Sequence, residues 1–308
     1  MTFPQMKRAY SAGHFGLYFD GSTTPGYVKS IEGGFAKANT MAEPVGTDNQ
    51  QIKHTSTREI EPFTAELGLA DCRDAMTWIR DSWRKQSSRR SGRIVHGDFN
   101  MFEQLDHEFR EALIMEAGFP ALEGGAGRES SYLRLKFLPE AVVSKRSGTS
   151  SRIVTPLAPQ QKQWLNSAFR FSLEGLDMSK VNKIDAFTIK QGVRTLHTGR
   201  ELYPEIEPTK IEFPDLTVYM ALEYADSVMR WYEQFVRTGK RDPRSERTGS
   251  IEYLHPDRTG VNFRINLYEV GLKSFNIIKS DGMGDAIKRA KFELYVGKMD
   301  VDLGSGFA

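Results

Sequence analysis

Two stretches of the chain carry apolar residues at helical spacing. In residues 71–83 these residues fall three, four or seven positions apart, which places them on one face of an α-helix; they are Cys72, Ala75, Met76, Ile79 and Trp83. Residues 224–237 show the same pattern with Tyr224, Val228, Trp231, Tyr232 and Phe235. We expect one helix in each stretch, the first capped by Asp71 and the second ended by Gly239.

Most other apolar positions alternate with polar ones, as in strands that bury one face. The expected strands of the first half are residues 14–21, 27–32, 63–69, 132–138 and one that starts at 94. Those of the second half are residues 169–175, 184–189, 216–222, 249–253 and 290–296. Residues 109–116 are ambiguous because their propensity also allows a helix. The chain is therefore expected to be mainly β, with single helices set against sheets.

Long polar stretches separate these elements. Residues 35–61 are too long for an ordinary connection and indicate an extended hairpin or a functional loop. Residues 84–93 read as a basic loop, either solvated or facing an acidic partner. Residues 144–163 combine serines and basic residues with two prolines, a composition typical of a boundary between domains.

The order of these elements recurs along the chain. Met76-Thr77-Trp78 in the first helix matches Met229-Arg230-Trp231, 153 positions later. Two helices that contain a tryptophan match by chance easily, but five landmarks keep the same order at offsets of 153 to 159 residues. This regularity predicts an internal duplication. It also favours a strand over a helix at 109–116, because the matching residues 263–270 are rich in strand formers.

The composition is that of a globular chain of one large or two ordinary domains, with 308 residues and 39% hydrophobic residues. A net charge of +2 argues against a dedicated nucleic-acid-binding protein. Cys72 is the single cysteine, which excludes an intrachain disulfide and predicts a buried thiol on the helix stripe. Without a long apolar run or a signal-peptide pattern, we expect a soluble protein made in a reducing compartment.

No catalytic or metal-binding motif is complete. The nearest cluster is formed by His96, Asp98 and His107, but nothing in the sequence makes these residues converge as metal ligands must. The second half has only His255 at the matching place. We therefore expect no catalytic residue, no cofactor and no metal site.

Two further stretches invite a functional interpretation and do not support one. The glycines of residues 123–127 lack the Lys-Ser/Thr of a phosphate loop and follow no strand–helix unit, so they predict a turn. Three acidic residues lie in a segment bounded by prolines and are expected to be solvated; they are Glu201, Glu205 and Glu207.

The order of motifs resembles a known family. A strand ending in Phe19-Asp20-Gly21 precedes a second strand, the hairpin of 35–61 and a strand that runs into an Asp-x-x-Asp-Ala-x-x-Trp-Ile helix starting at Asp71. Gly92, Phe109-Arg110 and a closing strand follow, with Leu133, Leu135 and Phe137. This order resembles the tail-tube proteins of contractile-tailed phages and related injection systems, which are similar in fold to the type VI secretion tube protein. The resemblance covers residues 14–143 well and 167–303 more loosely.

This resemblance implies two tandem tail-tube-like β-barrel or sandwich domains, each with one flanking helix. The expected division is an arm at 1–12, a first domain at 13–143, a linker at 144–166 and a second domain at 167–308. In the family, copies join edge to edge into six-fold rings that stack into a hollow tube, and the long hairpin contacts the neighbouring ring. By position that hairpin is residues 35–61 here, and more loosely 191–208.

The resemblance also implies partners and a location. The partners would be other copies of the chain, a sheath protein and baseplate or tube-initiator proteins, with no membrane anchor. DNA or effectors would pass through the lumen without sequence-specific binding. The protein would belong to a virion or injection particle assembled in the bacterial cytoplasm.

The duplication departs from typical members, which carry one unit. Two units per chain allow a trimer that mimics a six-fold ring, as in a tail hub or tube-initiation component. They also allow six chains with one unit outside or above the other. Two hypotheses that assign the chain to other functional classes stay open. One is a nucleic-acid-binding module that uses residues 84–93, and the other is an enzyme or metal protein that uses His96, Asp98 and His107.

Overall fold

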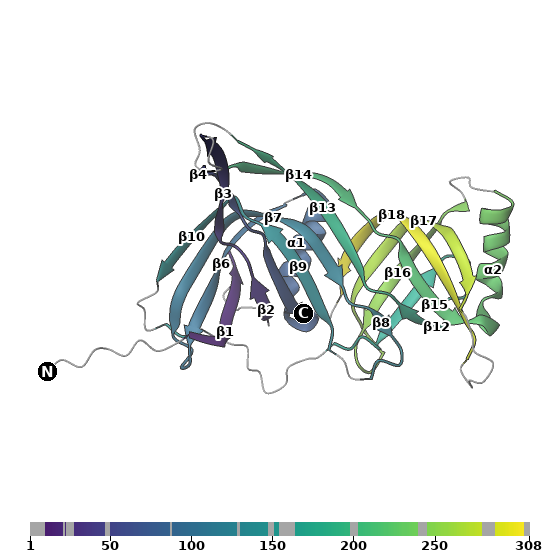
Figure 1. Ribbon diagram of the computed structural model, residues 1–308. Coiled ribbons are helices and arrows are strands. Elements are labelled where there is room, and N and C mark those ends of the chain that lie inside the picture. The colour runs from purple at the N-terminus through teal and green to yellow at the C-terminus, as the bar shows by residue number, and fades with distance from the viewer. Residues whose placement is uncertain are drawn as a thin grey trace.

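The computed structural model describes residues 10–20, 22, 28–46, 50–86, 88–127, 130–146, 151–153, 164–197, 203–239, 245–278 and 287–304. This part of the chain is mainly β and contains two α-helices, α1 (Arg73–Trp83) and α2 (Asp226–Tyr232). Two large antiparallel sheets lie next to each other, and each curls, as Figure 1 shows. The expected fold class is confirmed.

The first sheet contains nine strands from both halves of the chain. They are β1 (Tyr10–Phe19), β2 (Val28–Glu32), β5 (Phe63–Gly68), β6 (Arg89–Asp98), β7 (Glu103–Phe119), β9 (Tyr132–Leu138), β10 (Ala141–Arg146), β13 (Phe187–Leu196) and β14 (Glu205–Glu212). The second sheet contains seven: β8 (Leu122–Glu123), β11 (Phe169–Leu173), β12 (Val181–Ile184), β15 (Leu216–Ala221), β16 (Arg247–Leu254), β17 (Val261–Ile277) and β18 (Arg289–Leu303). A separate hairpin joins β3 (Ala36–Val45) to β4 (Gln50–Ile60).

The two large sheets share one strand order. It is β1-β6-β7-β9-β5-β2 in the first sheet and β11-β16-β17-β18-β15-β12 in the second. Their irregularities also match: β7 carries Glu111 at φ 49° and β17 carries Glu269 at φ 54°, and the ladder to the next strand shifts after Ile114 and after Leu272. Residues on the same rung of matching ladders are called corresponding residues below.

The halves exchange strands, which the sequence did not predict. The short strand β8 of the first half pairs with β12, and the β13–β14 hairpin of the second half pairs through β13 with β7. Hydrogen-bonded sheet therefore runs across the expected boundary.

Several strands begin or end away from the expected positions. The first strand begins at Tyr10, within the segment expected as an arm, and β10 runs to Arg146, within the segment expected as a linker. The arginines from Arg89 onward belong to β6 rather than to a loop. The single strand expected at 184–189 is split between β12 and β13. Gly21, Glu201 and residues 1–9, 147–150 and 154–163 lie outside the described residues.

The stripe of α1 is buried as expected, including Cys72, Ala75, Met76, Ile79 and Trp83. Trp78 is fully buried as well, and its Nε1 donates a 2.8 Å hydrogen bond to the Ser88 carbonyl. The aromatic rings of Phe19 and Phe137 pack edge-on against it. This aromatic cluster fixes α1 on the first sheet.

The helix ends differ from the expected ones. Asp71 lies in a 3₁₀ turn, η1 (Leu69–Asp71), and Cys72 takes the N-cap position without a side-chain cap. Burial raises the pKa of the Cys72 thiol. The second helix continues beyond α2 as a π-helical turn, η3 (Glu233–Arg237), and Gly239 follows at φ 72°. Tyr224 precedes α2 and is exposed rather than buried. None of the described helices is long and apolar enough to cross a membrane.

Candidate functional site

The two halves of the chain contact each other through strand pairing, aromatic packing and polar bonds. At the centre of this contact, β13 pairs with the end of β7 in the register Phe187↔Phe119 to Lys190↔Glu116. The rings of Phe119 and Phe187 stack with centroids 5.2 Å apart. The ladder between β6 and β7 ends at Leu113, so β13 takes the edge that β6 leaves open. We call Glu116–Phe119 together with the outer face of α1 the covered flank.

Helix α1 completes this contact because it lies against β7 and also against β18 of the second sheet. Trp83 meets Phe213 edge-on at 6.0 Å, and Ser82 Oγ donates a 2.9 Å hydrogen bond to Gln191 Oε1. Arg84 forms two hydrogen bonds to Asp300, at 2.8 and 2.7 Å. The covered flank thus combines strand pairing, aromatic packing and one bidentate ion pair.

The second half has the same elements without this cover. The ladder between β16 and β17 ends at Val270, and no described residue pairs with that side of Ser274–Ile277. Helix α2 packs on β17 of its own sheet and lies on the outer flank of the molecule in Figure 1. We call Ser274–Ile277 together with the outer face of α2 the open flank.

Large apolar side chains are exposed on the open flank. Ile277 is 49% exposed, whereas the corresponding Phe119 is 2% exposed. Met229 on α2 is 37% exposed, whereas its counterpart Met76 on α1 is 0% exposed. Apolar groups gathered at an unpaired sheet edge mark an interaction surface.

The β3–β4 hairpin also carries exposed apolar side chains. It rises from the first sheet in Figure 1, and its exposed apolar residues are Phe35 at its base, Met41, Val45 and Ile52. The corresponding hairpin of the second half is β13–β14, whose base is paired with β7. The extended hairpin expected at 35–61 is confirmed, and residues 191–208 lie in the β13–β14 hairpin as far as the structure describes them.

The arginines of residues 84–93 are bound within the chain rather than displayed to a partner. Arg89 pairs with Glu140, Arg90 with Asp81 at 3.2 Å, and Arg93 with Asp106 at 3.4 Å. Arg84 pairs with Asp300, as described above. Each of these arginines is thus paired with an acid, which leaves less free positive charge for a nucleic acid than the sequence suggests.

His96 and His107 come together, but Asp98 does not join them. The two rings meet edge-on at 5.4 Å, and His107 Nδ1 lies 2.8 Å from Ser144 Oγ. Burial lowers the pKa of both imidazoles. Asp98 instead accepts hydrogen bonds from the backbone of Asn100 and Phe102, and the described residues contain no cluster of three metal-ligand side chains.

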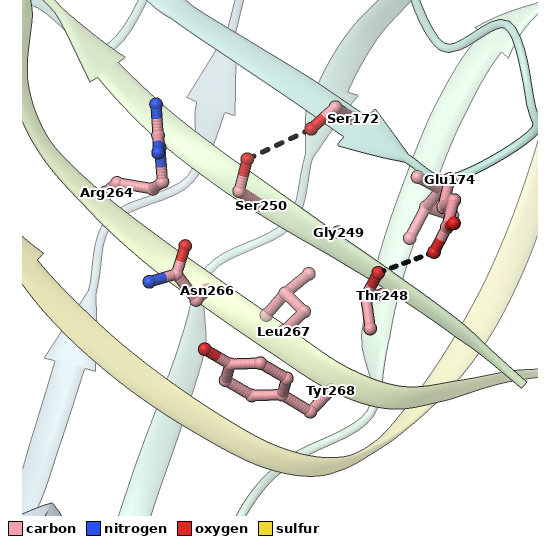
Figure 2. Close-up of a pocket in the computed structure, with 10 residues that line it drawn as sticks. Ser172, Glu174, Thr248, Gly249, Ser250, Arg264, Asn266, Leu267 and Tyr268 are labelled. Atoms are coloured by element: carbon pink, nitrogen blue, oxygen red, sulfur yellow. Dashed lines mark hydrogen bonds between the residues drawn. The ribbon is translucent and has the colours of Figure 1, made fainter.

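A hollow of about 400 Å³ lies over β11, β16 and β17. Figure 2 shows the Ser172 hydroxyl bonded to Ser250 and the Thr248 hydroxyl bonded to Glu174. Arg264 at its rim is held by Glu252 at 2.9 and 2.6 Å. Ser172 and Ser250 correspond to Tyr18 and Arg93 of the first sheet. These two side chains are larger, and they make a cation–π contact with each other. The hollow therefore reflects smaller side chains on a shared framework.

The sequence did not single out Glu116–Phe119 or Ser274–Ile277. The available signal was the length of the alternating pattern, which continues past residue 116 and past residue 270. A strand that outruns its neighbour leaves an edge for another strand.

No family model and no curated protein sequence matches the chain. Solved structures that resemble it include the sheath–tube complex of the PVC extracellular contractile injection system in the extended state, at 11% identity and a TM-score of 0.36, over 44% of this chain and 88% of that one. Another is the tube-terminating cap of the anti-feeding prophage, at 13% identity and 0.40, over 47% and 97%. A third is the baseplate of the anti-feeding prophage, at 12% and 0.33, over 44% and 90%. Each similarity spans less than half of this chain.

Proposed function

We propose that the chain is a structural subunit of a contractile injection system or phage-like tail, and that three copies form one pseudo-six-fold ring. The observation that carries this proposal is the edge-to-edge pairing of β13 with β7 inside a single chain. In the proposed ring, two units that pair edge to edge in this way are neighbours. Joining open strand edges is also the means by which such a ring removes them.

The proposal includes an internal duplication. The shared strand order of the sheets, the matching ladder shifts and the left-handed residues Glu111 and Glu269 support it. We propose that residues 13–143 and 167–308 are the two units and 144–166 the linker between them. Edge pairing within the chain favours side-by-side units over units placed one above the other, and thus a trimer over six chains.

In this proposal the chain works without catalysis or a cofactor. Its partners are its own copies and the sheath, baseplate or tube-initiator proteins of the particle. A hub or tube-initiation component fits the pseudo-six-fold trimer better than a major tube subunit, because typical tube subunits carry one unit. Cargo passes through the lumen of the ring.

Negative-stain electron microscopy of the purified chain tests the proposal. We expect rings, alone or stacked. A chain that stays monomeric at high concentration, with or without other tail components, would contradict it.

The outer part of the β3–β4 hairpin is proposed to contact the next ring. Ile52 is 50% exposed on β4, so Ile52→Arg should leave the folding of the protomer unchanged while a buried charge at the ring–ring contact blocks stacking. We expect single rings for Ile52→Arg and longer stacks for the control Ile52→Val, counted in micrographs. Stacks of unchanged length in the arginine variant would exclude this contact.

A further inference from the structure

The covered flank of the first half provides a template for what covers the open flank of the second. In the first half, one β-hairpin and one long strand edge meet: the base of β13–β14 pairs with β7. The second half offers the matching edge at Ser274–Ile277, and the first half offers the matching hairpin, β3–β4. Every copy of the chain therefore carries a hairpin, β3–β4, that matches the open flank in the way that β13–β14 matches the covered flank.

We propose that the base of the β3–β4 hairpin of a second copy pairs with Ser274–Asn276 of β17. This inference rests on the proposed function and supplies the contact that holds the chains together. The occupant is a second copy of this chain rather than another protein, because the same chain already seats the corresponding hairpin on the corresponding edge.

The register of this pairing follows from the one inside the chain. Rungs Lys37↔Glu59 of β3–β4 and Lys190↔Glu212 of β13–β14 hold the same place in the two hairpins. On the strand edge, Glu116 and Ser274 each follow the ladder shift of their strand. The pair Lys190↔Glu116 thus predicts Lys37 of one copy opposite Ser274 of another, and Thr188↔Gly118 predicts Phe35 opposite Asn276.

The exposed apolar residues fit this pairing. Phe35 is 56% exposed and leans edge-on against His107 of its own sheet, with centroids 5.0 Å apart. In the proposed register Phe35 lies opposite Asn276, and the exposed Ile277 lies on the next rung, opposite Gly34, with its side chain on the other face of the sheet. Pairing of the two strands would satisfy the unpaired edge and cover part of each side chain on its own face of the sheet.

The backbone at the base of the hairpin allows this approach. Gly33 and Gly34 have φ of 90° and 80°, and a Cβ at Gly33 would lie 2.1 Å from the Pro62 carbonyl oxygen. The corresponding residues Ala186 and Phe187 lead directly into the paired strand β13. Glycine is the residue that can change between these backbone conformations at low cost, so the hairpin can be redirected onto a neighbour.

Helix α2 gains a matching cover in the same arrangement. Within the chain, α1 meets Asp300 on the part of β18 that pairs with β17 through Asp300↔Asn266. The corresponding residue of the first half is Val143 on β10, which is exposed. A second copy would thus bring Val143 toward the outer face of α2, where Met229 is exposed. The contact is head to tail, and head-to-tail contacts close into rings when the rotation per unit allows it.

Engineered cysteines test the register directly. A chain with Phe35→Cys is mixed with a chain of different mass, fused to a tag, that carries Asn276→Cys, and the mixture is oxidised. Cys72 is buried and remains in both chains. We expect a disulfide-linked product of mixed mass, because cross-strand partners have the Cα separation that a disulfide requires. Lys37→Cys with Ser274→Cys is expected to link in the same way.

The matched control is Tyr268→Cys paired with Phe35→Cys. Tyr268 is exposed on the same strand but lies on the far side of the Glu269 irregularity, away from the open flank. We expect no mixed product from this pair. Equal linking by the control, or no linking by either test pair, would overturn the proposed register.

Micrographs of the same samples separate this inference from the proposed function. Rings whose chains do not link through Phe35→Cys and Asn276→Cys would overturn the inference and leave the proposed function standing. Linked chains that never form rings would support the pairing and contradict the ring. Monomers that do not link would overturn both.

Discussion

The covered and open flanks show how one framework is completed in two ways. Both flanks present the end of a long strand and the outer face of a helix, and the strands carry the same irregularities. In the first half, Phe119 and Met76 are buried; in the second, Ile277 and Met229 remain exposed. Since the framework is shared, the difference arises from a neighbour that, among the residues the structure describes, only the first half has. The apolar residues of the second half are those expected if a neighbour also exists there.

The largest loss of stability is expected from changes to the tryptophans of the two helices. Trp78 and Trp231 are both buried against their sheets, so replacement of either by alanine should cost about 3–5 kcal/mol of unfolding free energy. The variants Trp78→Phe and Trp231→Phe should differ. Trp78 Nε1 bonds the Ser88 carbonyl, whereas Trp231 Nε1 has no hydrogen-bond partner among the described residues.

We therefore expect Trp78→Phe to lose more stability than Trp231→Phe, because the first change leaves a carbonyl without its donor. Denaturant unfolding of the isolated chain measures both. Equal losses in the two phenylalanine variants would contradict this assignment of the two indoles.

A middle-sized effect tests the flanks themselves. Met76→Ala should cost about 2–5 kcal/mol because the side chain is fully buried. Met229→Ala should cost the isolated chain under about 1 kcal/mol, because its side chain is partly in water. In the assembled state we expect the second variant to weaken chain–chain contact, measured by the concentration at which rings dissociate. A large loss of monomer stability on Met229→Ala would mean that the open flank is covered within the chain.

The smallest effect concerns pH and belongs to the first half alone. Burial lowers the pKa of His107 and His96 below the ordinary value of 6.5, so at lower pH the unfolded chain binds protons that the native chain does not. Stability should be complete above about pH 6.5 and should fall as the pH drops below it. The corresponding positions of the second half hold Tyr253 and Ile265, which do not titrate in this range.

The variant His107→Ile, which installs the residue of the second half, should make the unfolding free energy less dependent on pH. Denaturant unfolding at several pH values between neutrality and mild acid measures this slope. An unchanged slope would place the titrating groups elsewhere in the chain.

The sequence predicted much of the local structure. Alternation located most strands, helical spacing located both helices, and the length of the polar stretch located the β3–β4 hairpin. It failed where charge or pairing overrode the pattern. The strand β6 begins at Arg89, which pairs with Leu113 of β7 and whose charge is met by Glu140, whereas a run of charged residues alone predicts a loop. The prediction that Asp71 caps the first helix was wrong because a 3₁₀ turn that contains Asp71 precedes the helix.

The candidate site was out of reach for a different reason. Pairing of β13 with β7 joins residues about 70 positions apart, such as Phe187 and Phe119, and no local pattern specifies which free edge a strand will take. The repeat in the sequence indicated two matching units. Only the three-dimensional arrangement shows that the second half supplies a strand to the edge of β7, and that the matching edge of β17 is left without a partner among the described residues.

The number of chains in a ring distinguishes a pseudo-six-fold trimer from a ring of six chains. Mass measurement of purified rings, with chains of 34.9 kDa, counts them without any variant. We expect three chains per ring, since each chain contributes two neighbouring units joined by the same strand pairing. Six chains per ring would contradict that expectation, because the two units of one chain would then not be neighbours within a single six-unit ring.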